Sequence, residues 1–429
     1  MLLSNLLQTT YNMVDMAIVG RFIGSAGLAG VAIGTDIMSL MLFVALGFCS
    51  AVQVIISQLV GASDKEAVSR SIGTFFTSLM ILAVVLTAVC FIGVDTFLKL
   101  MNTPPEAYAY ARTFILTYSA GIIFSFGYNL VSAILRGMGD SRHPLMFIAI
   151  SAFTNLIFAL LFVAVLGWGT FGAALATVTG QTLSFITSVI LLYRNRSSFG
   201  FDFKPKSFLI DPVVLKKFLK LAIPMCLQSV MINFSMLFVN SFINAYGVVA
   251  TSVTSIGWKI ALMSTVISNS LSTAGAAMIG QSLGAGKSER VPRVIRFSMV
   301  VNVIYAVIFT TIIYLIPRAI FGLFNSETEV LDMAMLFVPV VILNIYGFAI
   351  RAPFMGLING VGRPILNFCV AILDGVLGRI GLALLMGITL GMGINGFWYG
   401  AVFAGYIPII IGIVYLASGK WKTAKLLLS

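Results

Sequence analysis

Twelve apolar segments follow one another along the chain, and most are long enough for a helix to cross a bilayer. A membrane-spanning helix needs about 20 predominantly apolar residues. None of the segments alternates apolar and polar residues as the strands of a membrane barrel do. The sequence therefore predicts an all-α membrane protein with about 12 transmembrane helices. The segments lie near residues 1–20, 28–59, 68–94, 107–135, 144–166, 170–193, 213–245, 248–283, 291–318, 330–358, 365–390 and 394–417.

Composition excludes a soluble globule. Hydrophobic residues make up 59% of the chain and charged residues only 9%, against about 45–50% and about 25% in soluble domains. The net charge of +12 comes from short basic clusters between the apolar segments. This pattern favours contact with membrane lipids over contact with nucleic acid.

An internal repeat relates residues that are 223 positions apart. Gly34 is matched by Gly257, and Gln58 to Ala62 are matched by Gln281 to Ala285. The chain is thus predicted to contain two homologous six-helix lobes, which lie parallel about a pseudo-twofold axis normal to the membrane. We expect an N-terminal lobe over 1–194, a linker over 195–212 and a C-terminal lobe over 213–429.

The basic residues indicate the orientation of the chain. Because each repeat has an even number of spans, its basic connectors all fall on one face, which the positive-inside rule makes cytoplasmic. A multi-pass protein of the cytoplasmic (inner) membrane is expected, with the C-terminus in the cytoplasm. Met1 pairs best with Met225, so the first helix is expected to be truncated. The clusters are Lys65/Arg70, Arg136/Arg142, Arg194 to Lys220, Lys287 to Arg296, Arg363 and Lys420 to Lys425.

Several patterns exclude enzymes and nucleotide binding. The GxGxxG runs at 167–172 and 391–396 follow no strand and are interpreted as turns between helices. The P-loop-like run ending at Lys287 has Gln281 where the first glycine is required. The single His143 cannot form a metal cluster, and four scattered cysteines are interpreted as small core residues. No catalytic residue, cofactor or nucleotide is predicted.

Charges at membrane depth are the main functional candidates, because each is costly unless it is paired or hydrated. Asp15 has the most informative context. Asn5, Gln8, Asn12 and Asp15 share one helix face, which must look into the bundle or a wet cavity. Asp15 therefore offers a carboxylate that can titrate or bind Na⁺, although a structural role with a basic partner is the alternative. The charges at depth are Asp15, Asp36, Lys259, Arg351, Asp374 and Arg379.

Three of these charges are candidates for a substrate cavity. Asp36 and Lys259 occupy equivalent repeat positions, so they either contact substrate or form a salt bridge between the lobes. Asp374 and Arg379 are five residues apart, a poor spacing for direct pairing on an α-helix. A structural network is favoured over a ligand site for that pair.

The sequence resembles the multidrug and toxic compound extrusion (MATE) family over nearly its whole length. The resemblance rests on Asp15-Met-Ala-Ile-Val-Gly20-Arg21 with the following Gly24 and Gly34, on Gln58 to Ala62, and on Arg136 to Asp140. It implies two six-helix lobes with a cleft that opens alternately to either face. It also implies export of small organic cations or drugs in exchange for Na⁺ or H⁺.

The resemblance further implies which side chains bind the coupling ion. The matching positions are Gln8, Asp15, Asn129, Asn155 and Thr177, to which the polar face of the first segment adds Asn12. Some relatives carry a second acid where this chain has Ala159, which puts a site with two carboxylates in doubt. The oligomeric state is open, and a monomer is favoured.

Other functions remain as alternatives. A flippase for lipid-linked oligosaccharides or lipids has a similar bilobed plan, but it predicts a more basic central cavity and often extra helices. An intramembrane enzyme would need a nucleophile and base or metal ligands at depth. A receptor or structural protein would show no ligand-driven cation flux.

Overall fold

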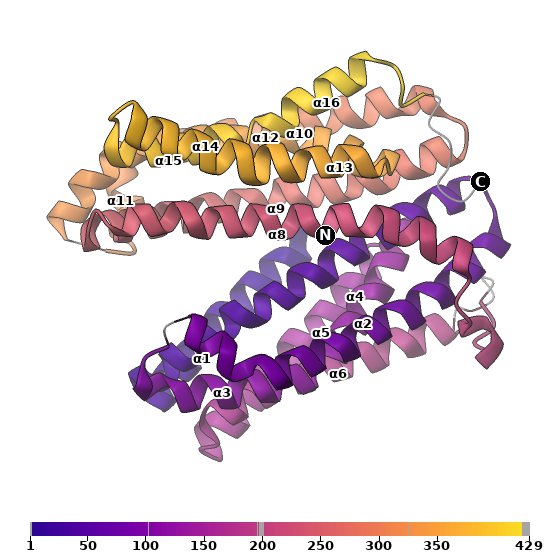
Figure 1. Cartoon of the computed structure of the whole chain (residues 1–429), viewed down its shortest axis with the longest axis horizontal. Helices are drawn as coiled ribbons and strands as arrows, with labels where there is room; N and C mark the ends of the chain where they lie inside the picture. The colour runs from indigo at the N-terminus through magenta and orange to yellow at the C-terminus, as the bar shows by residue number, and fades with distance from the viewer. Residues whose placement is uncertain (1, 102, 195, 197–200, 326, 423–429) are drawn as a thin grey trace. The chain divides into compact units, whose positions relative to one another are not determined.

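The computed structural model describes residues 2–101, 103–194, 196, 201–325 and 327–422, without the side chains of residues 2–17 and 25. Contacts divide the chain into two units, Met1–Leu219 and Lys220–Leu427. The described residues form helices and no β-strand. This confirms the all-α prediction (Figure 1). The predicted limits of the lobes and linker stay predictions.

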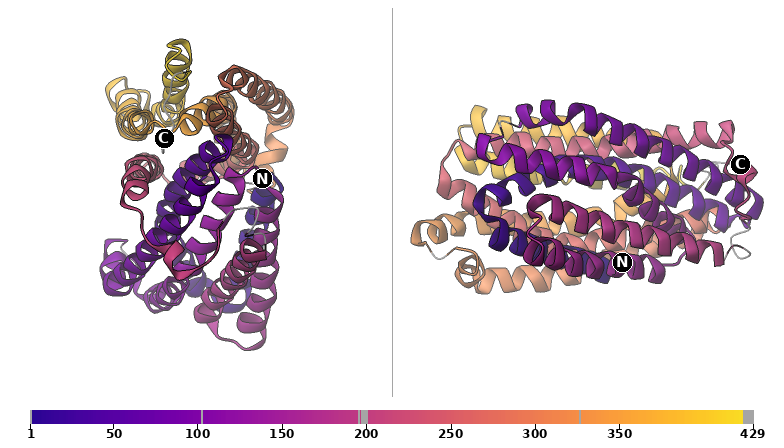
Figure 2. Two further views of the ribbon diagram at one scale, coloured as in Figure 1. Left: turned by 90° about the vertical axis from the view of Figure 1, so that its right-hand side faces the viewer. Right: turned by 90° about the horizontal axis from the view of Figure 1, so that it is seen from below.

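The first unit is a bundle whose helices lie side by side along their lengths (Figures 1 and 2). Gly24, at φ 81° and ψ −177°, breaks the long α1 into two parts that correspond to the first two apolar segments. Only a residue without Cβ adopts this conformation at little cost. The helices are α1 (Leu2–Gly61), α2 (Lys65–Leu100), α3 (Pro105–Ala120), α4 (Ile122–Gly137), α5 (Arg142–Ala159) with a π-helical end at Leu160–Val165, and α6 (Gly169–Arg194).

The second unit repeats this plan with more interruptions. Its core packs α9, α10, α12 and α15 around large buried side chains such as Phe337 and Trp398. The segment after α12 alternates between α-helical and π-helical turns. The helices are α8 (Pro212–Asn244), α9 (Val248–Gly284), α10 (Val291–Leu315), α11 (Pro317–Gly322), α12 (Thr328–Val361), α13 (Pro364–Val370), the π-helix η4 (Ala371–Gly378), α14 (Arg379–Leu384), the π-helix η5 (Leu385–Thr389), α15 (Gly393–Ala404) and α16 (Ile407–Ala417).

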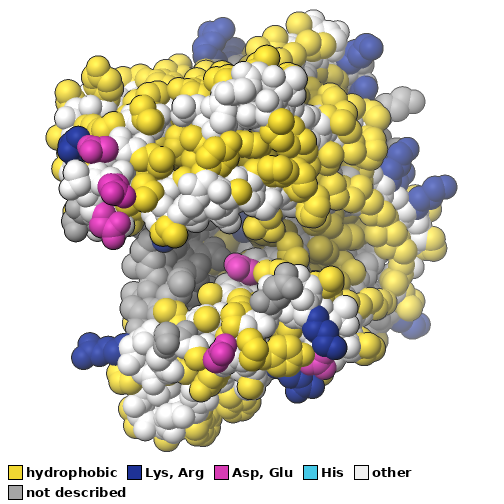
Figure 3. All heavy atoms as spheres, turned by 60° about the vertical axis from the view of Figure 1, so that its left-hand side comes forward, with side chains coloured by type: hydrophobic (Ala, Val, Ile, Leu, Met, Phe, Trp, Pro, Cys, Tyr) yellow, Lys and Arg dark blue, Asp and Glu magenta, His cyan; other side chains and the backbone are white. Residues whose placement is uncertain are grey.

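Nine of the described helices are long and apolar enough to cross a membrane, or ten if α3 and α4, bent by 50°, form one span. Hydrophobic side chains cover much of the helix flanks, as the space-filling view shows (Figure 3). Two differences explain why this number is below twelve. The first segment belongs to α1, whose early side chains lie outside the described part. The 37-residue α9 is rich in serine and threonine, and it is therefore less apolar.

The two units place equivalent residues in equivalent contacts. A Cβ on Gly34 would lie 2.5 Å from the Phe114 ring, and a Cβ on Gly257 would lie 2.1 Å from the Phe337 ring. Gly257 follows Gly34 by 223 positions, and Phe337 follows Phe114 by the same number of positions. The internal repeat of the sequence therefore corresponds to a helix packing that occurs once in each unit.

The two GxGxxG runs, at 167–172 and 391–396, begin in turns between helices, as the sequence predicts. Gly167 and Gly169 have φ of 66° and 58°, and Gly391 and Gly393 have φ of 66° and 57°. The third glycine of the second run serves close packing instead, because a Cβ on Gly396 would lie 2.3 Å from the backbone of the preceding helical segment. These are conformations and approaches that glycine alone allows without strain.

The segment between the two repeats docks on α2. The Thr77 hydroxyl donates to the Phe208 carbonyl at 2.6 Å, and the backbone N–H of Asp211 donates to the Thr74 hydroxyl at 3.0 Å. A Cβ on Gly73 would lie 1.7 Å from the carbonyl oxygen of Ser207. The part of the predicted linker around residues 207–211 is thus fixed to the first unit.

Candidate functional site

The structure brings together two of the residues that the family resemblance assigns to ion binding. Asn155 of α5 donates its amide N–H to the Thr177 hydroxyl of α6 at 3.0 Å. Asn155 is 3% exposed. The two helices approach closely near Asn155 and Thr177. A Cβ on Gly180 of α6 would lie only 2.6 Å from the carbonyl oxygen of Ser151 of α5. This hydrogen bond uses the amide N–H of Asn155, and the amide oxygen is the atom of this side chain that could bind a cation.

A second polar pair lies one turn along α6. The amide of Gln181 donates to the Tyr118 hydroxyl at 2.9 Å, and the buried amide oxygen of Gln181 has no hydrogen-bond partner among the described residues. Sequence reasoning missed both residues, although Gln181 follows Thr177 by four residues and so shares its helix face. Asn129, the third predicted residue, is buried and donates instead to the Ser125 carbonyl of its own helix at 2.9 Å.

The described end of the first part of α1 packs in the same apolar cluster as α5 and α6. Ile18 and Val19 are buried in one cluster with Ala159 of α5 and Ala173 of α6. Asn155 lies one turn before Ala159, Thr177 lies one turn after Ala173, and residue 15 lies one turn before Val19. Residue 15 of α1, Asn155 and Thr177 therefore each lie one helical turn from a residue of this cluster.

Side chains of Gln8, Asn12 and Asp15 lie outside the described part of the structure. Their assignment to an ion site stays a prediction, and so does the role of Asn129, Asn155 and Thr177. Ala159 is fully buried in the apolar cluster. Ala159 therefore contributes to helix packing, and it does not supply the second carboxylate that some relatives have at this position.

Asp36 and Lys259, the equivalent candidates of the two units, are both exposed on their own units. Whether they bind substrate or pair with each other stays a prediction.

A charged cluster lies inside the second unit. Asp374 of η4 is fully buried, and its two carboxylate oxygens meet different arginines. Arg379 Nη2 lies 2.9 Å from Oδ1, and Arg351 Nη2 of α12 lies 3.0 Å from Oδ2. The side chains of Arg379 and Arg351 are only 6% and 11% exposed. Three oppositely charged groups therefore share one buried site, and the predicted structural role of this network stays a prediction.

The interpretation that Asp374 and Arg379 are poorly placed for direct pairing is wrong. It assumed an α-helix, in which residues five apart point in different directions. Residues Ala371–Gly378 form a π-helix, whose wider turn closes hydrogen bonds from i to i+5. Residues five apart therefore lie on the same face here. Whether Asp374 also contacts substrate stays a prediction.

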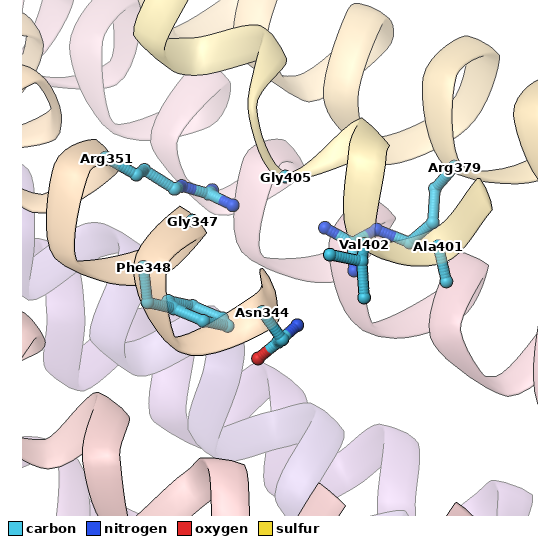
Figure 4. A pocket seen from close by; sticks show the side chains of 8 residues that line it. All are labelled: Asn344, Gly347, Phe348, Arg351, Arg379, Ala401, Val402 and Gly405. Carbon is cyan, nitrogen blue, oxygen red and sulfur yellow. The ribbon is translucent and has the colours of Figure 1, made fainter. Parts of the chain in front are cut away.

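A small cavity adjoins the two arginines. Its volume of about 10 Å³ is enough for one water-sized species. The guanidinium groups of Arg351 and Arg379 point toward one another across it (Figure 4). The lining residues are Asn344, Gly347, Phe348, Arg351, Arg379, Ala401, Val402 and Gly405.

Comparison with known proteins finds one family in both halves of the chain. The family described as MatE matches residues 1–161 and again residues 224–385. The two matched ranges begin 223 residues apart, since 224 less 1 is 223. This is the offset of the internal repeat.

Curated relatives and solved structures agree with this match. A probable multidrug resistance protein YoeA of Bacillus subtilis is 30% identical over 78% of this chain and 73% of its own length. A probable multidrug resistance protein NorM of Thermotoga maritima is 24% identical over 99% and 91%. A solved outward-facing conformation of a multidrug resistance MATE family transporter has the same fold, with a TM-score of 0.88 at 21% identity, and covers 99% of this chain and 94% of that one.

Proposed function

Because the chain belongs to the MatE family, we propose that it exports small organic cations and lipophilic drugs across a membrane in exchange for Na⁺ or H⁺. Family membership confirms the resemblance found in the sequence, and it makes the protein a multi-pass membrane transporter rather than an enzyme. The relatives are named as multidrug resistance proteins. The coupling ion and the transport cycle are the parts that we propose.

One observation supports the coupling site: the Asn155–Thr177 hydrogen bond joins two helices that share an apolar cluster with Ile18 and Val19 of α1. Asp15 would supply the carboxylate and the amide oxygen of Asn155 a second, neutral oxygen. Hard cations such as Na⁺ bind oxygen ligands, and a proton needs only the carboxylate. The site therefore supports either ion, with Gln8, Asn12 and Asn129 as further polar groups.

Coupling follows if ion and drug favour different conformations. Ion binding at Asp15 would shift the first part of α1 and lower the affinity for the drug, and the lobes would then turn inward. Such exchange requires only that the two ligands stabilise different states of one bistable element. The outward-facing relative supports a cycle in which the cleft opens to alternate faces.

Reconstituted transport tests this function. Proteoliposomes loaded with a fluorescent organic cation are exposed to a Na⁺ gradient at equal pH and, separately, to a pH gradient at equal Na⁺. We expect one of the two gradients to drive the cation uphill, with protein-free liposomes as the control. Absence of driven transport under both gradients would contradict the proposal.

The proposed orientation places the basic connectors in the cytoplasm of a cell with the protein in its inner membrane. Exposed positions 142, 206 and 287 represent three of these connectors. Single cysteines there should resist an impermeant thiol reagent in intact cells and react after the cells are opened. Cys49, Cys90, Cys226 and Cys369 are first replaced by serine or alanine.

A cysteine at exposed position 318, in α11, is the matched control. The proposed orientation puts this position on the opposite face, so it should react in intact cells. Labelling of any connector cysteine from outside would contradict the orientation.

A further inference from the structure

The buried cluster of the second unit holds more positive than negative charge. Arg351 and Arg379 share the single carboxylate of Asp374, which leaves one positive charge uncompensated within the cluster. A net charge buried at membrane depth is destabilising unless something neutralises it. The site therefore favours an additional anion.

No other acidic residue of this unit can supply that charge. Besides Asp374, the unit contains Glu289, Glu327, Glu329 and Asp332. Glu289 lies in the connector before α10, and the other three lie at the beginning of α12. Asp332 already pairs with Arg318.

One donor of a residue that lines the cavity lacks a partner. Arg379 Nε is buried without a hydrogen-bond partner among the described residues, whereas the amide oxygen of Asn344, which also lacks one, is an acceptor that an anion does not satisfy. Arg379 and Asn344 are 5% and 9% exposed. A buried donor without a partner is destabilising, so a ligand that accepts from Arg379 would remove that cost.

The depth and size of the cavity restrict the ligand. Asp374 is the eleventh residue of the helical segment that begins at Pro364, so about 15 Å of helix separates it from the nearer end. A phospholipid headgroup does not reach the middle of a hydrocarbon core about 30 Å thick. With a volume of about 10 Å³, the cavity is too small for a drug-sized anion.

We propose that Arg351 and Arg379 bind one small monovalent anion of halide size, such as chloride, in the cavity beside Asp374. The anion accepts hydrogen bonds from both guanidinium groups and neutralises the cluster. Asp374 fixes the two arginines, and the anion completes the charge balance. This site binds the opposite charge from the proposed substrates, and it depends on neither the coupling ion nor the direction of transport.

Thermal stability of the purified protein tests the proposal without a transport assay. Chloride is exchanged for gluconate at constant sodium concentration. Binding to the folded state raises the melting temperature with the free ligand concentration, so wild-type protein should melt about 3 °C or more higher in saturating chloride. Arg379→Gln should abolish this difference, because it removes the excess charge and the unpartnered donor.

Arg318→Gln is the matched control. It removes an arginine of the same unit whose side chain is 61% exposed, and it should keep the chloride effect. Equal chloride shifts in wild type and Arg379→Gln would overturn the proposal, as would the absence of a shift in wild type.

A second measurement covers the case in which Arg379→Gln does not fold. Crystals of the wild-type protein grown in bromide should show an anomalous peak within hydrogen-bonding distance of guanidinium nitrogens of Arg351 and Arg379. Diffraction data that show no bromide in this cavity would overturn the proposal, whatever ions bind elsewhere on the surface.

Discussion

Asp15→Asn is expected to abolish ion-coupled export while the protein remains folded and inserted. Asparagine is nearly isosteric with aspartate and retains hydrogen-bonding capacity, so the neighbouring polar face can still be satisfied. It cannot titrate, and it offers a cation a neutral oxygen in place of a carboxylate. Drug transport driven by a Na⁺ or pH gradient should fall to the level of protein-free liposomes.

The measurement compares liposome transport and melting temperature for the same preparations. Asp95→Asn is the control, because Asp95 of the same unit is half exposed and pairs with Arg112. It should transport as wild type does. A well-folded Asp15→Asn protein that exchanges drug for ion at the wild-type rate would disprove the proposed coupling.

The alternative role for Asp15 predicts a different result. If Asp15 served only to hold a buried base, its replacement would leave that base unpaired and cost about 3–5 kcal/mol of stability. Loss of transport together with a large loss of stability would therefore favour the structural role. Loss of transport at unchanged stability favours ion binding.

Much of the fold could be predicted because membrane helices are governed by simple rules. The apolar lengths predicted the spans, and the offset of 223 predicted which contacts would recur. Gly137 and Gly360 illustrate this: a Cβ would lie 2.8 Å from the Gln53 carbonyl oxygen in one unit and 2.7 Å from the Ala276 carbonyl oxygen in the other. A glycine retained in both repeats marks a close approach of helix backbones.

The local helix type could not be predicted in the same way. Nothing in the residues from Ala371 to Gly378 distinguishes an i to i+5 hydrogen-bonding pattern from the usual i to i+4 pattern. The pairing of Asp374 with Arg379 depends on that difference. Arg351 joins them from a helix distant in sequence, so spacing gives no signal for its contact.

Part of the polar contact between α5 and α6 could be predicted, while its role in ion binding stays a prediction. The resemblance placed Asn155 and Thr177 in one site, and the structure shows their hydrogen bond. Gln181 and Tyr118 were missed because the polar pattern of α6 includes many hydroxyl residues, most of which bond only to their own helix, as Thr179 does with the Leu175 carbonyl. Only tertiary contact separates the residues that face a neighbouring helix from those that do not.

Asp374→Asn is expected to lower the free energy of unfolding of the second unit by about 3–5 kcal/mol, because it leaves two buried guanidinium groups without their carboxylate. Asparagine keeps the shape of the side chain, so the loss reports the charge rather than a cavity. Thermal or denaturant unfolding of the purified protein measures it.

Asp332→Asn is the matched control for this loss. Asp332 pairs with Arg318, but these side chains are 57% and 61% exposed, so its replacement should cost less than about 1 kcal/mol. If Arg351 and Arg379 bind an anion, chloride should restore more of the stability of Asp374→Asn than of Asp332→Asn, because the bound anion then replaces the missing carboxylate. A fully stable Asp374→Asn protein in the absence of chloride would contradict the expectation that Asp374 compensates the charge of Arg351 and Arg379.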